Sequence, residues 1–417
     1  MANTSARELA EQILASCLQD GTWPGRTLDD LIERALDENE SIATFATRAL
    51  FGILIERLGD LFEPSLCDIY ARLFSIVISR VMPEYSADEL LLRYRQIRQV
   101  HRFAGGEVER VFVLSRVTLG ADVAVTSVAL AAAKERFPEA EIYLVGPKKN
   151  AELFTADPRI KPLPVAYVRS SLLIDRLGAA VELKTLIDEP TTIVIDPDSR
   201  LTQLGLIPVC DDARYFFFES RAFGGELDAG LPELTAEWLT EVFDVERMRP
   251  YVAPEPQERI AEITVSFGVG GNPDKRLGDE FEYRVLSELV ALNRPILLDC
   301  GAGGEEAAQA NALVERLGSP AWLHLHQGSY ASFASHIVQS HLYVGYDSVG
   351  QHVAAAAGIP MVSVFAGYAS ERMLARWRPR GSNVHVIVDG EADRDTVRDR
   401  TLQAIELAFA ATRERSK

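Results

Sequence analysis

Residues 343–360 read YVGYDSVGQHVAAAAGIP, and this stretch decides how the chain is expected to fold. An apolar run ends at Asp347 and Ser348, and a run of four alanines follows Gly350 and His352. A short apolar run bounded by polar residues and glycine is typical of a buried strand. The alanines would let the following helix lie close to the sheet. The stretch therefore predicts a strand, a loop and a helix of a parallel α/β sheet.

The same alternation of strand and helix recurs before and after this stretch. Strands are expected near 110–115, 141–146, 191–198, 215–220, 322–327, 361–367 and 384–388. Each of the stretches 263–271, 295–318 and 341–348 is expected to begin with a strand that a loop follows. Helical stretches of about 10–15 residues between such strands predict parallel sheets that carry helices on both faces.

Changes of composition divide the chain. Apolar residues recur at helical spacing up to about residue 104, and the strand and helix alternation starts only after Gly105 and Gly106. The proline-containing stretch 251–262 has the composition of a linker. We expect a helical domain at 1–104, Rossmann-like domains at 105–255 and 256–390, and a C-terminal helix at 391–417. The predicted fold class is α/β, with two doubly wound domains facing each other across a cleft after an all-α domain.

The balance of charge limits the classes of partner. The chain has 417 residues, with 43 basic and 61 acidic side chains and a formal net charge of −18. Such a surface disfavours nucleic acid and anionic lipid, although a cleft can keep a local field that attracts a small anion. Four scattered cysteines indicate neither a zinc motif nor a disulfide framework. Without a signal-peptide pattern or a long apolar run, we expect a cytoplasmic protein with no transmembrane segment.

The loop at 347–352 is the first candidate site. In open α/β sheets, ligands bind beyond the carboxyl ends of the strands. The first N–H groups of a helix carry partial positive charge, so a phosphate fits there. Gly350 would admit the phosphate, and His352 could donate to one of its oxygens. The alternative is that Asp347 or Ser348 only caps the helix.

A glycine-rich turn at 266–280, SFGVGGNPDKRLGDE, is the second candidate. Gly270 would free backbone N–H groups, and Lys275 and Arg276 are cations that bind phosphate. A solvated loop whose charges bind nothing is the alternative. Because no GK[ST] sequence is present, a P-loop ATPase is not indicated.

Two further turns follow expected strands. In CGAGGEEAAQ, at 300–309, Gly301 permits a tight turn, and Glu305 or Glu306 could reach ribose hydroxyls. The two acids could equally favour the start of a helix. In SRVTLGADVAV, at 115–125, the polar residues are Arg116, Thr118 and Asp122, and Asp122 could be a helix cap. This loop lacks a GxGxxG fingerprint, so nicotinamide binding is only weakly indicated.

Metal binding has one candidate motif. Asp196-Pro197-Asp198 resembles the DxD signature that holds a divalent metal in some sugar-transferring enzymes. The motif is short, and a structural role for both acids is the alternative. The histidines in the second half of the chain lack a carboxylate or a cysteine at metal-ligand spacing, so we expect no metal site and no cofactor.

Three segments, in order, resemble the ADP-heptose:lipopolysaccharide heptosyltransferase family, which is glycosyltransferase family 9 with the GT-B fold. They are VFVLSRVTLGADVAVTSVALAAAKERFPEAEIYLVG at 111–146, SFGVGGNPDKRLGDEFEYRVLSEL at 266–289 and VGYDSVGQHVAAAAGIPMVSVFAG at 344–367. The resemblance covers roughly residues 108–390. The chain departs from it at Leu277, where the family commonly has tryptophan, and at Val349, where it has glycine.

The resemblance implies an inverting, metal-independent glycosyltransferase whose donor is a nucleotide-diphosphate sugar, with an ADP-sugar as one candidate. It implies that Asp122 is the base that deprotonates the acceptor, and Arg116 and Thr118 would lie on the acceptor side. The residues expected to bind the donor are Gly270, Lys275, Arg276, Gly301, Glu305, Asp347, Ser348, Gly350 and His352. The acceptor would be a glycan, a lipid-linked molecule or a protein.

Two other functions are consistent with the same residues. One is a nucleotide-sugar epimerase or hydrolase on the same fold. The other is a catalytically silent module that binds a nucleotide or a protein. The N-terminal helical region could be a packed bundle without chemistry, or it could bind a protein partner or a second copy of the chain.

Overall fold

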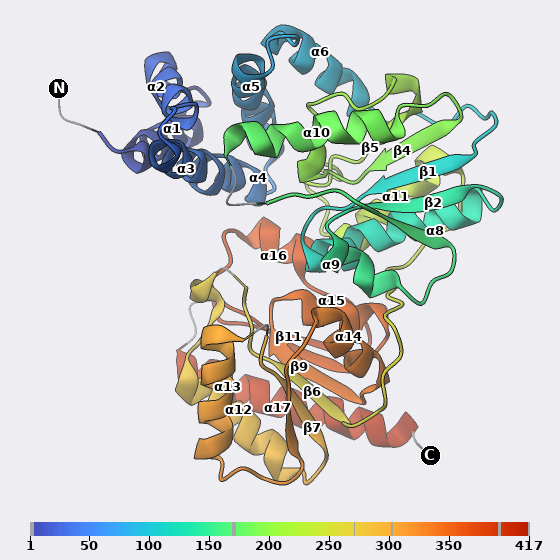
Figure 1. The fold of residues 1–417 in the computed structure, drawn as a ribbon. Helices are drawn as coiled ribbons and strands as arrows, with labels where there is room; N and C mark the ends of the chain where they lie inside the picture. Colours follow the sequence, from blue (N-terminus) through green and yellow to red (C-terminus); the bar gives the residue numbers. More distant parts are fainter. Residues whose placement is uncertain (1–3, 169–171, 271, 302, 391–392, 416–417) are drawn as a thin grey trace. The chain divides into compact units, whose positions relative to one another are not determined.

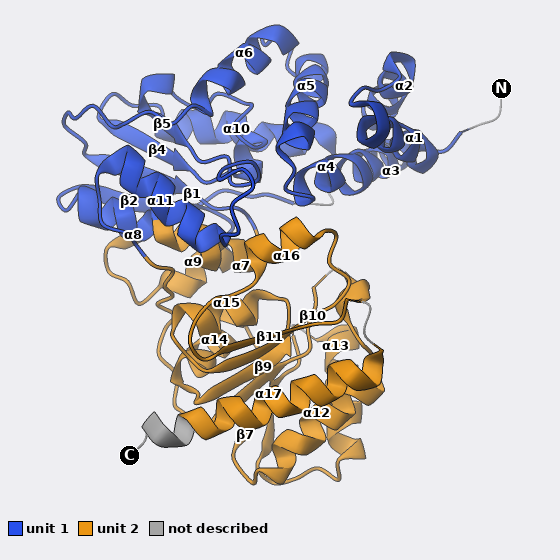
Figure 2. Ribbon diagram, turned by 180° about the vertical axis from the view of Figure 1, so that it is seen from behind, with its two compact units in different colours: residues 1–117, 129–148, 161–248 blue, residues 118–128, 149–160, 249–417 orange. Residues whose placement is uncertain are grey.

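The computed structural model describes residues 4–168, 172–270, 272–301, 303–390 and 393–415 (Figure 1). Its internal contacts group the chain into two compact units, shown in Figure 2. Unit 1 comprises Met1–Val117, Ala129–Lys148 and Lys161–Met248, and unit 2 comprises Thr118–Val128, Lys149–Ile160 and Arg249–Lys417.

The N-terminal part of unit 1 is helical. Its helices are α1 (Ala6–Asp20), α2 (Gly25–Ala35), α3 (Glu40–Arg48), a π-helical segment (Ala49–Ile55), α4 (Glu56–Asp60), α5 (Pro64–Val81) and α6 (Ala87–Ile97). Capping boxes begin α1 and α6, where Ser5 and Ser86 exchange hydrogen bonds with Glu8 and Glu89. These bonds satisfy N–H groups that have no partner within the helix.

The first sheet also belongs to unit 1. Its strands are β1 (Arg110–Leu114), β2 (Glu141–Gly146), β3 (Ile160–Pro164), β4 (Thr192–Asp196) and β5 (Tyr215–Phe217), in the order β3-β2-β1-β4-β5. The strands β1, β2, β4 and β5 pair in parallel. The helices between and after these strands are α8 (Ser127–Arg136), α10 (Leu173–Ile187) and α11 (Leu231–Phe243). The strand order reverses between β1 and β4, which is where ligands bind in open α/β sheets.

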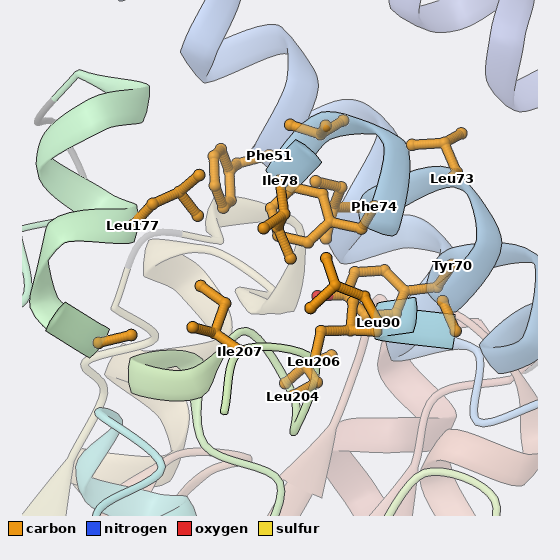
Figure 3. Close-up of a cluster of buried hydrophobic side chains, with 14 of the residues drawn as sticks. Phe51, Tyr70, Leu73, Phe74, Ile78, Leu90, Leu177, Leu204, Leu206 and Ile207 are labelled. Atoms are coloured by element: carbon orange, nitrogen blue, oxygen red, sulfur yellow. The ribbon is translucent and has the colours of Figure 1, made fainter. Parts of the chain in front are cut away.

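The N-terminal helices share a hydrophobic core with the connections of the first sheet. Figure 3 shows side chains of the π-helical segment and α5 packed near α10 and near the segment that follows β4. Tyr70 donates its hydroxyl to the carbonyl of Gln203 at 3.1 Å, and the guanidinium of Arg176 lies 4.0 Å from the ring centroid of Phe51. These contacts hold the segment after β4 against the helices.

Unit 2 contains the second sheet. Its strands are β6 (Ile263–Ser266), β7 (Ile296–Asp299), β8 (Leu323–His326), β9 (Leu342–Tyr346), β10 (Met361–Phe365) and β11 (Val384–Val388), in the order β11-β10-β9-β6-β7-β8. All neighbouring strands in this order pair in parallel. The strand order reverses between β6 and β9, so the loops after these two strands meet at the ligand-binding edge.

Helices flank this second sheet (Figure 1). They are α12 (Asp279–Ala291), α13 (Gly304–Arg316), α14 (Tyr330–Gln339), α15 (Val349–Ala356), α16 (Glu371–Trp377) and α17 (Arg394–Arg415). Two earlier segments also group with unit 2. They contain α7 (Leu119–Ala121), a π-helical turn (Asp122–Thr126), most of α9 (Lys148–Ala151) and a 3₁₀ turn (Glu152–Phe154).

The predicted α/β class, with two parallel sheets after a helical region, is confirmed. The division of the chain into four domains stays a prediction. Of the C-terminal helix predicted at 391–417, residues 391, 392, 416 and 417 lie outside the described part, and α17 covers 394–415. Every helix in the described part of the chain is too short or too polar to cross a lipid bilayer.

Candidate functional site

The two loops at the reversal point of the second sheet are joined by an ion pair. The loop after β6 carries Lys275, and the loop after β9 carries Asp347. The Lys275 ammonium lies 2.6 Å from Asp347 Oδ2 and 3.3 Å from the Asp347 carbonyl oxygen. Their side chains are 18% and 7% exposed, so the pair is largely shielded from solvent. The topology thus brings together two predicted donor-binding residues that are far apart in sequence.

The start of α15 is built around a tyrosine hydroxyl. A Cβ atom on Gly350 would overlap the hydroxyl of Tyr343, which lies beneath it. Glycine is therefore required here for packing inside the unit. Ser348 occupies the N-cap position of α15 without forming a side-chain capping bond. Asp347 bonds to side chains of Lys275 and Gln351.

His352 lies one turn into α15 and is buried. Its ring packs against that of Trp377, with 5.6 Å between centroids, and a Cβ atom on Gly120 would lie 3.1 Å from its Cδ2 atom. Burial lowers the pKa of His352 to about 4, despite the opposing attraction of Asp347, and the nearby Lys275 lowers it further. The imidazole is therefore neutral at pH 7, with one ring nitrogen as donor and the other as acceptor.

Asp122 lies in the π-helical turn that packs against α15 within unit 2. Its carboxyl group is fully buried. One oxygen accepts a 2.6 Å hydrogen bond from the Thr126 hydroxyl, and the other accepts from the side-chain amide of Asn150. These hydrogen bonds hold the carboxylate of Asp122 in place.

Arg276 bonds to side chains other than those of the Lys275 ion pair. Its Nε donates to Glu282 at 2.8 Å and its Nη1 to Gln309 at 2.6 Å. The hydrogen bond and the charge of Glu282 raise the pKa of Arg276. Glu282 is fully buried, and the positive charge of Arg276 compensates its carboxylate. Both side chains line a small pocket. The polar residues and glycines of this pocket are Gly268, Arg276, Glu282, Asp299, Gly301, Glu306 and Gln309.

The two glycine turns contribute unequally to this pocket. Gly301 has a φ of +62° and lines the pocket, and a Cβ atom there would overlap the carboxylate of Glu306. Both Glu305 and Glu306 are exposed, but only Glu306 lines the pocket, and Glu305 accepts from Gln309 at 3.4 Å. Gly270, with a φ of +62°, is exposed and has open space around it.

The residues predicted on the acceptor side fall in different units. Thr118 precedes α7 in unit 2, whereas Arg116 follows β1 in unit 1. Arg116 Nη2 lies 3.9 Å from Asp198 Oδ2, and both side chains are buried. Asp198 also accepts from Ser220 at 2.8 Å and from Arg221 at 2.6 Å. This cluster lies at the reversal point of the first sheet.

The DxD-like acids are occupied by protein donors. Asp196 accepts from the Ser199 N–H at 2.6 Å and from the hydroxyls of Thr202 and Tyr215. Burial raises its pKa to about 6, against the opposing effect of these bonds. Asp198 is bound by the side chains just described. These bonds favour the structural interpretation of the motif, and the described residues hold no cluster of three acids, histidines or cysteines placed for a metal.

Sequence reasoning missed the residues that support the site. Gln351 and Ser363 hold Asp347 from inside the unit, and Thr126 and Asn150 hold Asp122. The sequence offers one signal, which is Gln351 as a polar residue in a helix rich in alanine and valine.

Comparisons with known proteins give a likeness of fold. No sequence profile of a known family matches the chain, and no curated protein matches it by sequence. The glycosyl transferase family 9 structure from Veillonella parvula is 15% identical, covers 75% of this chain and 100% of its own, and has a TM-score of 0.55. E. coli ADP-heptose lps heptosyltransferase II is 17% identical, covers 73% and 98%, and has a TM-score of 0.52. E. coli heptosyltransferase WaaC with ADP is 16% identical, covers 73% and 99%, and has a TM-score of 0.52. The chain therefore has a fold similar to that of family 9 glycosyltransferases and heptosyltransferases, as its sequence motifs predicted.

Proposed function

We propose that the chain is an inverting glycosyltransferase that moves a sugar from a nucleotide-diphosphate donor to an acceptor hydroxyl. The observation that carries this proposal is the pairing of Lys275 with Asp347 at the reversal point of the second sheet, beside the start of α15. The likeness of fold supports it, because one structure of similar fold was solved with ADP. An ADP-sugar is therefore the first donor to test.

The charges at the site suit a diphosphate. An ammonium has three N–H donors, and Lys275 directs two of them at Asp347, so the third is available to a phosphate oxygen. The carboxylate of Asp347 is balanced by Lys275 and by the amide of Gln351, which limits its repulsion of the donor. The N–H groups at the start of α15 add partial positive charge. Neutral His352 would then interact with the donor as a hydrogen-bonding group.

The proposed reaction needs a base and a stabilised leaving group. The acceptor oxygen bonds to the anomeric carbon as the bond from that carbon to the diphosphate oxygen breaks, which inverts the configuration. The acceptor proton passes to the carboxylate of Asp122. Lys275 and the start of α15 stabilise the negative charge left on the diphosphate, so the proposed reaction is independent of a metal ion.

A melting screen followed by product analysis tests this function. The chain is heated with saturating ADP, UDP, GDP or CMP and with their sugars, and a ligand at about 100 times its Kd should stabilise it by ~2.7 kcal/mol. The best donor is then incubated with and without glycan, lipid-linked and protein acceptors. Transfer that requires an acceptor supports the proposal. Release of free sugar without acceptor would indicate a hydrolase, and an altered sugar on an intact nucleotide would indicate an epimerase. Failure of every nucleotide to raise Tm would favour a silent module.

A further inference from the structure

Gln351 lies at the centre of a buried chain of hydrogen bonds in unit 2. The Ser363 hydroxyl on β10 donates to Gln351 Oε1 at 2.6 Å. The amide nitrogen of Gln351 donates to Asp347 Oδ1 and also faces His352 Nε2 at 3.4 Å. Asp347 in turn accepts from Lys275 through its other carboxylate oxygen. This series of hydrogen bonds thus runs from β10 in the sheet to Lys275 at the sheet's carboxyl edge.

The chemistry of the partners fixes the orientation of this amide. An ionised carboxylate only accepts hydrogen bonds, so the Gln351 nitrogen must face Asp347 and its oxygen must face Ser363. The second N–H of the amide then points at His352 Nε2, which makes that nitrogen an acceptor and places the ring proton on Nδ1. Both Gln351 and Ser363 are fully buried, so solvent does not compete for these bonds.

We infer that Gln351 is a positioning residue for the donor site. It holds the Asp347 carboxylate in the orientation that keeps the Lys275 ammonium at the reversal point, and it sets the tautomer of His352. This inference rests on the proposed function, because it assigns Lys275 and His352 to donor binding. Gln351 itself is buried and acts through its neighbours. Without its amide, one buried oxygen of Asp347 would lose its partner, and the carboxylate would turn to find another.

The variant Gln351→Met tests this role. Methionine has a similar length and no N–H donor, so the bond to Asp347 is lost while much of the volume is kept. We expect binding of ADP, GDP or UDP, whichever the unsubstituted chain binds most tightly, to weaken at least about tenfold in calorimetric titrations. Gln339→Met is the matched control. It removes a glutamine that bonds to Gln257 and Ser335 in the same unit, and it should bind as the unsubstituted chain does.

A second variant separates positioning from a merely structural role. Gln351→Glu places a second carboxyl group beside Asp347. The introduced carboxylate repels that of Asp347, so nucleotide binding at pH 8 should be weak. Protonation of the introduced group restores a hydrogen-bond donor to Asp347. The affinity of the variant, divided by that of the unsubstituted chain at the same pH, should therefore rise at least about fivefold from pH 8 to pH 5.5. The melting temperature of each ligand-free variant identifies any that fails to fold.

The outcomes distinguish the inference from the proposed function. Weaker binding by Gln351→Met, together with recovery of Gln351→Glu at low pH, supports the positioning role. Unchanged affinity in a folded Gln351→Met variant would overturn that role alone, as would a Gln351→Glu variant whose affinity does not recover. If the unsubstituted chain bound none of the three nucleoside diphosphates, the proposed function would be overturned and this inference with it.

Discussion

Asp122 is the residue on which turnover is expected to depend most. The variant Asp122→Asn keeps an oxygen that can accept from Thr126 but cannot take up a proton. We expect kcat to fall by about 10²- to 10⁴-fold, with a much smaller change in donor affinity. Steady-state kinetics and calorimetry measure the two effects. Thr126→Val is the control, because it removes one hydrogen bond and keeps the base, and it should lose less turnover. Equal losses of affinity and kcat in Asp122→Asn would contradict the base role.

His352 should make stability depend on pH. Its folded pKa of about 4 lies below the usual 6.5, so the unfolded chain binds more protons between these values. The contribution of His352 to the free energy of unfolding should therefore be largest above pH 6.5 and should fall, by up to ~3 kcal/mol, as the pH drops towards 4. Urea unfolding of the unsubstituted chain and of His352→Gln at pH 7.5 and 5 isolates the effect. A difference between the two chains that does not change with pH would be inconsistent with a neutral, buried imidazole.

The start of α15 depends on close packing against β9. In Gly350→Ala the added methyl group would meet the Tyr343 hydroxyl, so we expect a loss of about 1–3 kcal/mol in the free energy of unfolding. The double variant with Tyr343→Phe should recover only part of this loss, because the hydroxyl is gone but the overlapping ring carbons remain. Gly178→Ala in α10 is the control. Beyond its chain neighbours and the backbone of its own helix, nothing lies within 4 Å of the added Cβ, so Gly178→Ala should stabilise the chain by about 0.5–1 kcal/mol. An unchanged free energy of unfolding in Gly350→Ala would contradict this expectation and show that α15 can shift to make room for the methyl group.

Strands and helices were predictable here because their patterns are local. Alternating apolar runs and alanine-rich stretches identify β9 and α15 without any tertiary information. The meeting of Lys275 and Asp347 could be anticipated only as two loops at one edge of a parallel sheet, since the contact joins distant positions. Whether Glu305 or Glu306 faces the pocket depends on where α13 begins, and sequence patterns place helix ends poorly.

The side chains that hold Asp347 and Asp122 in place could not be predicted from the sequence. A glutamine in a helix and a serine in a strand have no characteristic spacing, so the chain from Ser363 through Gln351 to Asp347 appears only with coordinates. Asn150 reaches Asp122 from a separate segment for the same reason. The sequence indicated that a glycine at position 350 admits a phosphate, whereas in the structure Gly350 leaves space for the Tyr343 hydroxyl.

In unit 1, a buried carboxylate bonds the N-terminal helices to the first sheet. Glu219 follows β5 and accepts from the Tyr94 hydroxyl and from Arg98 Nε at 2.8 Å, both on or next to α6. Burial raises its pKa to about 7, against the opposing pull of Arg98 and the Tyr94 bond. The helices are therefore tied to the sheet by a group whose charge changes near neutral pH.

The free energy of unfolding of the whole chain should depend on the protonation of Glu219. Because the folded state holds the proton of Glu219 more tightly, the contribution of Glu219 to the free energy of unfolding should fall as the pH rises from about 4.5 to 7. Glu219→Gln cannot titrate, so the stability of the unsubstituted chain minus that of the variant should decrease by up to ~3 kcal/mol between pH 4.5 and 8. Denaturant unfolding at several pH values measures this difference. A constant or increasing difference would rule out the raised pKa.

Binding of a diphosphate by Lys275 can be measured directly by calorimetric titration with ADP, GDP and UDP. Removing a charged hydrogen-bond donor in Lys275→Ala should weaken binding by about 10- to 100-fold for the nucleotide that the unsubstituted chain prefers. Lys161→Ala removes an exposed ammonium that pairs with Glu141 in the first sheet, and it should bind normally. Equal affinities of Lys275→Ala and the unsubstituted chain would contradict the proposed donor site.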